Sequence, residues 1–89
     1  MEKQIHTFFI INLMKEKIDI GEVIKQKLKE KERYISWLAK QIGYTRSGLS
    51  KMLKQEQIHS ELLLRISYAL EYDFFTHYSV LLNNFLKKM

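Results

Sequence analysis

Apolar residues recur along most of the chain with the spacing of amphipathic helices. Residues three and four positions apart share one face of a helix, so each such run predicts a helix with one buried stripe. Five runs follow one another, at about residues 19–33, 35–42, 45–54, 59–72 and 74–88. Their apolar positions are Ile20, Val23, Ile24 and Leu28; Leu38, Ala39 and Ile42; Leu49, Met52 and Leu53; Leu62, Leu63, Ile66, Ala69 and Leu70; and Phe74, Tyr78, Leu81, Leu82 and Phe85. The pattern predicts an all-α fold.

Residues at the ends of these runs support the predicted helices. Asp19 and Glu22 have the spacing of a capping box, and Thr45 is a favourable N-cap. Gly43 permits a positive φ at the end of the second helix, at no steric cost. Ala39 is small enough to let two helix backbones approach closely. Tyr34, in contrast, is not a capping residue, and its ring is expected to cover the edge of the core.

Composition agrees with one small helical domain. The 89 residues include no Pro and three Gly, whereas turn-rich all-β folds need both. Cys is absent, which excludes a disulfide framework and a thiolate zinc site and allows a reducing compartment. The longest apolar run, residues 8–11, is far shorter than the roughly 20 residues of a membrane span. We therefore expect a cytoplasmic protein without a membrane segment.

The second and third predicted helices form a pair joined by a turn that contains Gly43. Two short helices arranged in this way are a helix-turn-helix unit, whose second helix can enter the major groove of DNA. The third helix carries five polar residues and no acidic one, as contact with phosphates requires: Arg46, Ser47, Ser50, Lys51 and Lys54. Gly48 lies inside this helix, where glycine is unfavourable. Two explanations fit this residue: close approach of the backbone to DNA, or a substitution that the helix tolerates.

The net charge of +5 is concentrated in one part of the chain. Residues 25–54 contain nine basic and two acidic residues and carry +7, so the remainder carries −2. A local basic surface fits a polyanionic partner, either nucleic acid or an anionic membrane. A solvated lysine-rich helix face would show the same composition.

Residues 20–72 resemble the lambda-repressor and Cro-like helix-turn-helix family of bacterial and phage regulators. The matching segments are IGEVIKQKL, WLAKQIGYTRSGLSKML and ELLLRISYAL, in which Leu38-Ala39, Ile42-Gly43, Leu49 and Met52 reproduce the family spacing. The resemblance implies a compact five-helix domain that binds double-stranded DNA. It also implies a homodimer, because family members usually read paired half-sites about one DNA turn apart.

Mapped onto this chain, the resemblance implies two sets of DNA contacts. The positions that meet base edges are Arg46, Ser47, Ser50 and Lys51. The positions that meet phosphates are Ile35, Tyr44, Thr45, Lys54 and Gln55. Ile35 lacks a polar side chain, so only its backbone N–H could serve there.

The chain departs from the family pattern at three places. Tyr34 replaces the usual Ser or Thr cap, so the second helix is expected to start less firmly. KQEQ, at residues 54–57, replaces the usual Glu-Asn-Gly-like turn. Leu70-Glu71 replaces the usual Leu-Gly ending, so the fourth helix is expected to run on or bend towards the fifth.

These features predict three segments. Residues 1–18 form an N-terminal extension, in which HTFFIINL is either a strand or disordered. Residues 19–72 form the helix-turn-helix DNA-binding domain. Residues 73–89 form an amphipathic helix that completes the core or provides a dimer surface, a role for which HTFFIINL is the other candidate.

Other function classes have less support. No catalytic residues, metal site or cofactor are expected, since the chain has no Cys or Gly-rich phosphate loop and its three His are widely separated. An antitoxin that binds a small toxin and regulates its own operon is the alternative function, because antitoxins often use the same fold. An anionic-membrane binder that uses residues 1–13 and the lysines is a weaker alternative.

Overall fold

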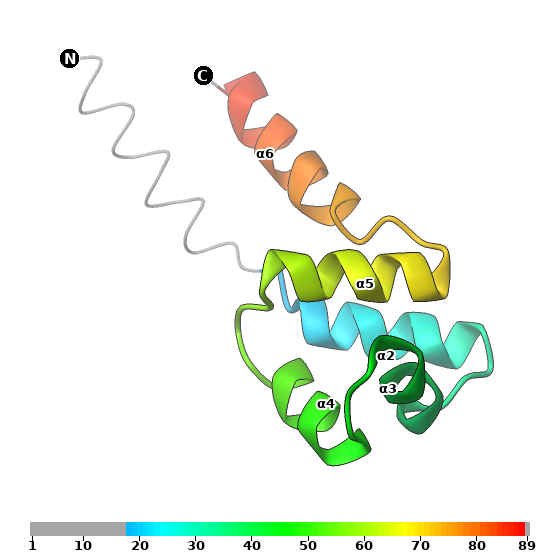
Figure 1. Cartoon of the computed structure of the whole chain (residues 1–89). Coiled ribbons are helices and arrows are strands. Elements are labelled where there is room, and N and C mark those ends of the chain that lie inside the picture. The colour runs from blue at the N-terminus through cyan, green and yellow to red at the C-terminus, as the bar shows by residue number, and fades with distance from the viewer. Residues whose placement is uncertain (1–17, 89) are drawn as a thin grey trace. The chain divides into compact units, whose positions relative to one another are not determined.

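Five helices follow one another in the computed structural model, which describes residues 18–88 (Figure 1). They are α2 (Ile20–Glu30), α3 (Ile35–Ile42), α4 (Arg46–Leu53), α5 (Ser60–Leu70) and α6 (Thr76–Lys88). All regular structure in this range is helical, so the predicted all-α class is confirmed. The predicted strand or disordered segment HTFFIINL lies outside the described residues.

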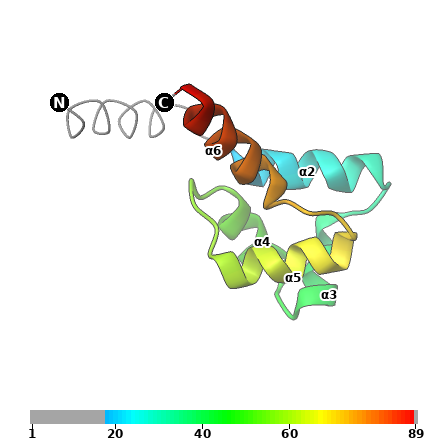
Figure 2. The same ribbon diagram turned by 90° about the horizontal axis from the view of Figure 1, so that it is seen from above.

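The chain divides into two compact units. One runs from Asp19 to Phe74 and contains α2 to α5, whereas α6 belongs to the other. Within the first unit, α3 packs against α4 and α5, and α2 packs against α4. Figure 1 and Figure 2 both show α2 and α5 running in the same general direction.

The core of the Asp19–Phe74 unit consists of the predicted apolar stripes. No polar or charged residue in the described range is buried. The buried hydrophobic residues of this unit are Ile20, Ile24, Leu28, Leu38, Ala39, Ile42, Leu49, Leu53, Leu62, Leu63, Ile66, Leu70 and Phe74. Val23, Met52 and Ala69 belong to the same stripes but are only half-buried.

Phe74 closes the core from outside any helix. The apolar pattern predicts it in the first turn of the last helix, but α6 begins only at Thr76. The Phe74 ring is fully buried and meets the edge of the Tyr72 ring, with 4.7 Å between centroids. Its backbone N–H donates to Ser67 Oγ at 3.4 Å. A residue predicted for the C-terminal helix therefore completes the preceding unit.

The helix starts agree with the capping residues in the sequence. Asp19 Oδ1 accepts a hydrogen bond from the Glu22 N–H at 3.2 Å, and Thr45 Oγ1 accepts one from the Gly48 N–H at 3.0 Å. Tyr34 is the N-cap of α3 and makes no side-chain cap bond, as expected because tyrosine is not a capping residue. The Tyr34 side chain is 81% exposed, so the expectation that it covers the core is wrong. 

Three helices are followed within two residues by a residue in the left-handed region. These residues are Gly43 with φ 75°, Glu32 with φ 55° and Glu71 with φ 50°. The next N–H in each case reaches back to a helix carbonyl: Tyr44 to Ala39 (2.8 Å), Arg33 to Leu28 (2.8 Å) and Tyr72 to Ser67 (3.0 Å). This is the Schellman arrangement, which glycine normally completes. Of the two alternatives expected at Leu70-Glu71, a helix that runs on or one that bends towards the fifth, the first is wrong, because Glu71 adopts the conformation typical of glycine and stops α5.

The last helix, α6, shows a mixed surface. Val80, Leu82 and Leu86 are exposed, whereas Phe85 is buried. Lys88 Nζ lies 5.2 Å from the centroid of the Phe85 ring. None of the helices described here combines the length and the apolar character that crossing a membrane requires.

Candidate nucleic-acid interface

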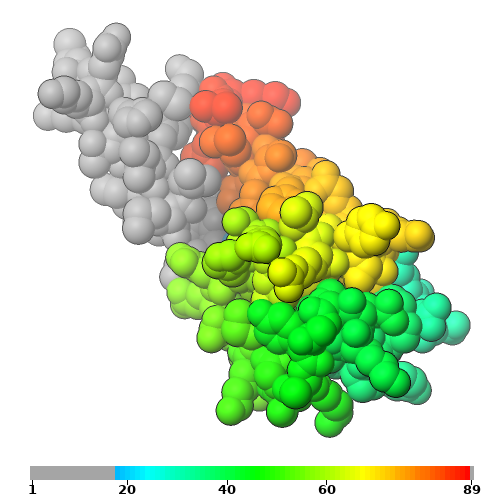
Figure 3. Space-filling model, viewed as in Figure 1, coloured from blue at the N-terminus to red at the C-terminus, as the bar shows by residue number. Residues whose placement is uncertain are grey.

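The turn between α3 and α4 sets the direction of α4. Gly43 ends α3 in the left-handed conformation, and extended backbone at Thr45 then starts α4. Leu49 and Leu53 are buried and fix the inner side of α4. The opposite side of α4 faces solvent, as Figure 3 shows for the green surface of the turn and α4.

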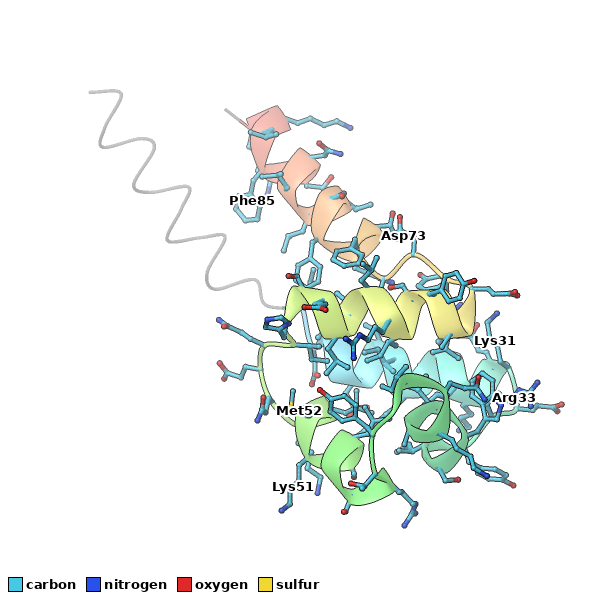
Figure 4. The ribbon with its side chains drawn as sticks, in the orientation of Figure 1. Lys31, Arg33, Lys51, Met52, Asp73 and Phe85 are labelled. Carbon is cyan, nitrogen blue, oxygen red and sulfur yellow. The ribbon has the colours of Figure 1, made fainter. Side chains whose placement is uncertain are left out.

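The predicted base-contact residues share this outer face of α4. Arg46, Ser47 and Lys51 are exposed, and Ser50 is half-buried. Their spacing of one, four and five residues places them together on two successive turns of a helix. Figure 4 shows Lys51 projecting from α4 away from the rest of the Asp19–Phe74 unit. The helix has eight residues and is therefore about 12 Å long, and none of its residues is acidic.

Four of the predicted phosphate-contact residues flank α4, and the fifth, Ile35, starts α3. Thr45, Lys54 and Gln55 are exposed, and Ile35 and Tyr44 are half-buried. The Thr45 oxygen already accepts the cap bond, which leaves its hydroxyl hydrogen to donate. Ile35 is the first residue of α3, so its N–H belongs to the first-turn groups that have no intrahelical acceptor.

Gly48 owes its identity to the cap of α4. A Cβ built on Gly48 would lie 2.8 Å from Thr45 Oγ1, closer than such atoms normally come. The same oxygen holds the Gly48 N–H at 3.0 Å. A larger residue at position 48 would therefore press on the group that starts the helix. Cap geometry explains this glycine without close approach to DNA.

Most of the basic residues between positions 25 and 54 have no acidic partner among residues 18–88. Lys25 pairs with Glu22 at 3.4 Å, and Lys27 pairs with Glu30 at 3.6 Å. No carboxylate of residues 18–88 lies within ion-pair distance of the other seven, which are Lys29, Lys31, Arg33, Lys40, Arg46, Lys51 and Lys54. The positive charge that the sequence concentrates in this window is thus left available to an anionic partner.

A groove at the connection between α2 and α3 was not among the predicted site elements. It has a volume of about 670 Å³ and is lined by Lys25, Leu28, Lys29, Glu32, Arg33, Tyr34 and Ile35. Two of its cations, Lys25 and Lys29, are four residues apart and share one side of α2, and Arg33 follows four residues later, beyond the end of that helix. That spacing is a signal from which the sequence alone could have indicated this basic edge. 

Comparisons with models of known protein families, with curated proteins and with solved structures find no match for this chain.

Proposed function

We propose that this chain binds double-stranded DNA in a sequence-specific manner and acts as a repressor-like transcriptional regulator. The observation that carries the proposal is the division of α4 into two faces. Leu49 and Leu53 lock one face into the core, and the other presents Arg46 and Lys51 with no carboxylate among them. A helix of this diameter fits the major groove of B-DNA, which is about 12 Å wide. 

The arrangement of α3 and α4 also supports a lambda-repressor-like or Cro-like domain. Two short helices meet across the Gly43 turn, α5 packs on the first of them, and α2 packs on the second. In this proposal α4 is the recognition helix, and the N–H of Ile35 at the start of α3 points to a phosphate. Lys54 and Gln55, which follow α4, meet the backbone on the other side of the groove.

Affinity and sequence preference come from different residues in this mechanism. Lysine and arginine side chains neutralise phosphates and release counterions, which gives affinity that falls as salt rises. Arg46 is the candidate for direct readout, because a guanidinium can donate two parallel hydrogen bonds to guanine. Ser47 and Ser50 offer hydroxyls to neighbouring base edges, and Lys51 can donate to a base or to a phosphate.

The proposed assembly on DNA is a homodimer. One α4 helix covers only a few base pairs, so two copies reading half-sites about one turn apart would be needed for a specific operator. Sedimentation of the protein with and without its selected duplex would measure the stoichiometry. Two chains on a site with inverted half-sites are expected, whereas one chain on an undivided site would contradict the dimer.

The test of the proposed function is a selection from random duplex DNA, carried out at two salt concentrations. The expected result is an enriched motif at both concentrations, with affinity that falls steeply as salt increases. Binding without enrichment at either concentration would reject sequence-specific recognition. Absence of duplex binding even at the lower salt concentration would reject DNA as the partner.

A further inference from the structure

The groove beside the α2–α3 connection combines an apolar floor with a cationic rim. Leu28 at its base is 2% exposed, and Ile35 is half-buried. The Tyr34 ring is 81% exposed and forms one wall, although exposure of an aromatic ring to water is unfavourable. Figure 4 places Arg33 at this connection, well apart from Lys51 on α4.

The groove has an excess of positive charge that its surroundings do not neutralise. The Lys25 ammonium is engaged by Glu22 at 3.4 Å. Lys29 and Arg33 are exposed and have no carboxylate within ion-pair distance among residues 18–88. Glu32 contributes the one carboxylate in the lining and leaves the balance positive.

Arg33 is held in a position suited to a planar contact. Its guanidinium carbon lies 4.6 Å from the centroid of the Trp37 ring, which supports one face of the group. Since no carboxylate of residues 18–88 pairs with Arg33, the nitrogen atoms at its edge can donate to a phosphate in a bidentate manner. Lys29 adds a mobile point charge from the adjacent part of α2.

The position of Ile35 indicates which molecule the groove binds. Ile35 lines the groove and is also the first residue of α3, whose N–H receives a phosphate in the proposed function. A DNA strand that reaches this N–H would continue along the groove, with its sugars against Leu28 and Tyr34. We propose that the groove binds the DNA backbone flanking the half-site, with Lys29 and Arg33 on successive phosphates. This inference rests on the proposed function.

Duplexes of two lengths test this groove. Both contain the selected site, but the shorter one ends where the base contacts of α4 end. The double variant K29Q/R33Q is expected to bind the longer duplex about tenfold more weakly than the wild type and the shorter duplex equally well. For the longer duplex, the slope of the logarithm of the binding constant against the logarithm of the salt concentration should become shallower by about two, since each phosphate contact contributes about 0.9. Glu32→Gln is expected to strengthen binding to the longer duplex several-fold.

K31Q/K40Q is the matched control, because Lys31 and Lys40 are exposed, carry the same two charges and do not line the groove. If K29Q/R33Q behaves like K31Q/K40Q on both duplexes, the groove proposal is overturned and α4 recognition stands. If the wild type binds neither duplex, the proposed function fails and the groove proposal fails with it. Lys29→Gln alone leaves the Arg33–Trp37 contact intact. If this single variant loses affinity for the longer duplex but not for the shorter one, the loss comes from a phosphate contact and not from disturbed packing.

Inorganic phosphate provides the remaining arm of the experiment. If low concentrations of phosphate displace the longer duplex from the wild type but not from K29Q/R33Q, and trimming the duplex has no effect, the groove binds a free phosphate group. That result would also overturn the assignment to flanking DNA. 

Discussion

Gly21 of α2 lies directly against the backbone carbonyl of Leu53 at the end of α4. A Cβ built on Gly21 would collide with the Leu53 carbonyl oxygen and would also come within 2.9 Å of the carbonyl carbon. The two helices therefore approach with no side chain between their backbones at this point. This crossing fixes the end of α4, and α4 carries the proposed base contacts.

Gly21→Ala is expected to lower the free energy of unfolding by about 3 kcal/mol, the upper end of the range for overpacking, because backbone atoms must move. Urea denaturation of the full chain measures the change. Gln26→Ala is the control, since Gln26 is exposed on the same helix and should change stability by no more than about 0.5 kcal/mol. Equal stabilities of the two variants would show that α2 and α4 can separate without cost.

Glu71→Gly is expected to stabilise the protein by about 0.5–1 kcal/mol. The left-handed conformation costs a non-glycine residue about 1–2 kcal/mol, and the greater unfolded-state entropy of glycine offsets part of the gain. Glu71→Ala removes the same charge but keeps the Cβ, so it should show no gain in thermal unfolding. If Ala stabilises as much as Gly, charge and not backbone strain is the cause.

Thr45 and Gly48 are expected to be coupled in a double-mutant cycle. Gly48→Ala alone should give little or none of the roughly 1 kcal/mol that alanine normally adds to a helix, because its Cβ presses on Thr45 Oγ1. Thr45→Ala alone should cost about 1 kcal/mol through loss of the cap. In the Thr45→Ala background, Gly48→Ala should recover the full propensity gain. Additive effects would contradict the steric explanation of Gly48.

Phe74→Ala is expected to destabilise the Asp19–Phe74 unit by about 3–5 kcal/mol, because it empties a fully buried position. Tyr68→Ala is the control, since Tyr68 is 87% exposed and its loss should leave stability nearly unchanged. Denaturant midpoints of the two variants provide the comparison. A small effect at position 74 would mean that the core closes without this ring.

Arg46→Ala and Lys54→Ala are expected to affect DNA binding in different ways. Loss of a bidentate guanine contact should remove about 1–3 kcal/mol of discrimination at one base position and relax the selected motif there. Loss of Lys54, a phosphate contact, should weaken all duplexes alike and reduce the salt slope by about one. Selection with each variant measures both effects. An unchanged motif with Arg46→Ala would reject its role in readout.

The sequence determined the elements of this fold. Apolar spacing located all five helices in the described range, because an amphipathic helix must bury one stripe wherever it packs. Thr45 and Asp19 marked helix starts through local hydrogen bonds that depend only on residues three positions apart. The outer face of α4 followed from the same periodicity, since the residues opposite Leu49 and Leu53 must face solvent.

The structure decided the features that the apolar spacing does not show. The need for glycine at position 21 arises from the Leu53 backbone, which lies far along the sequence. Helix propensity did not indicate that Glu71 would stop α5, because the compensating bond from the Tyr72 N–H to the Ser67 carbonyl forms only when Glu71 is left-handed. The groove at Ile35 is likewise formed by residues of α2, of the connection at Arg33 and Tyr34, and of the start of α3. The spacing of residues along one helix does not predict how these parts lie next to one another.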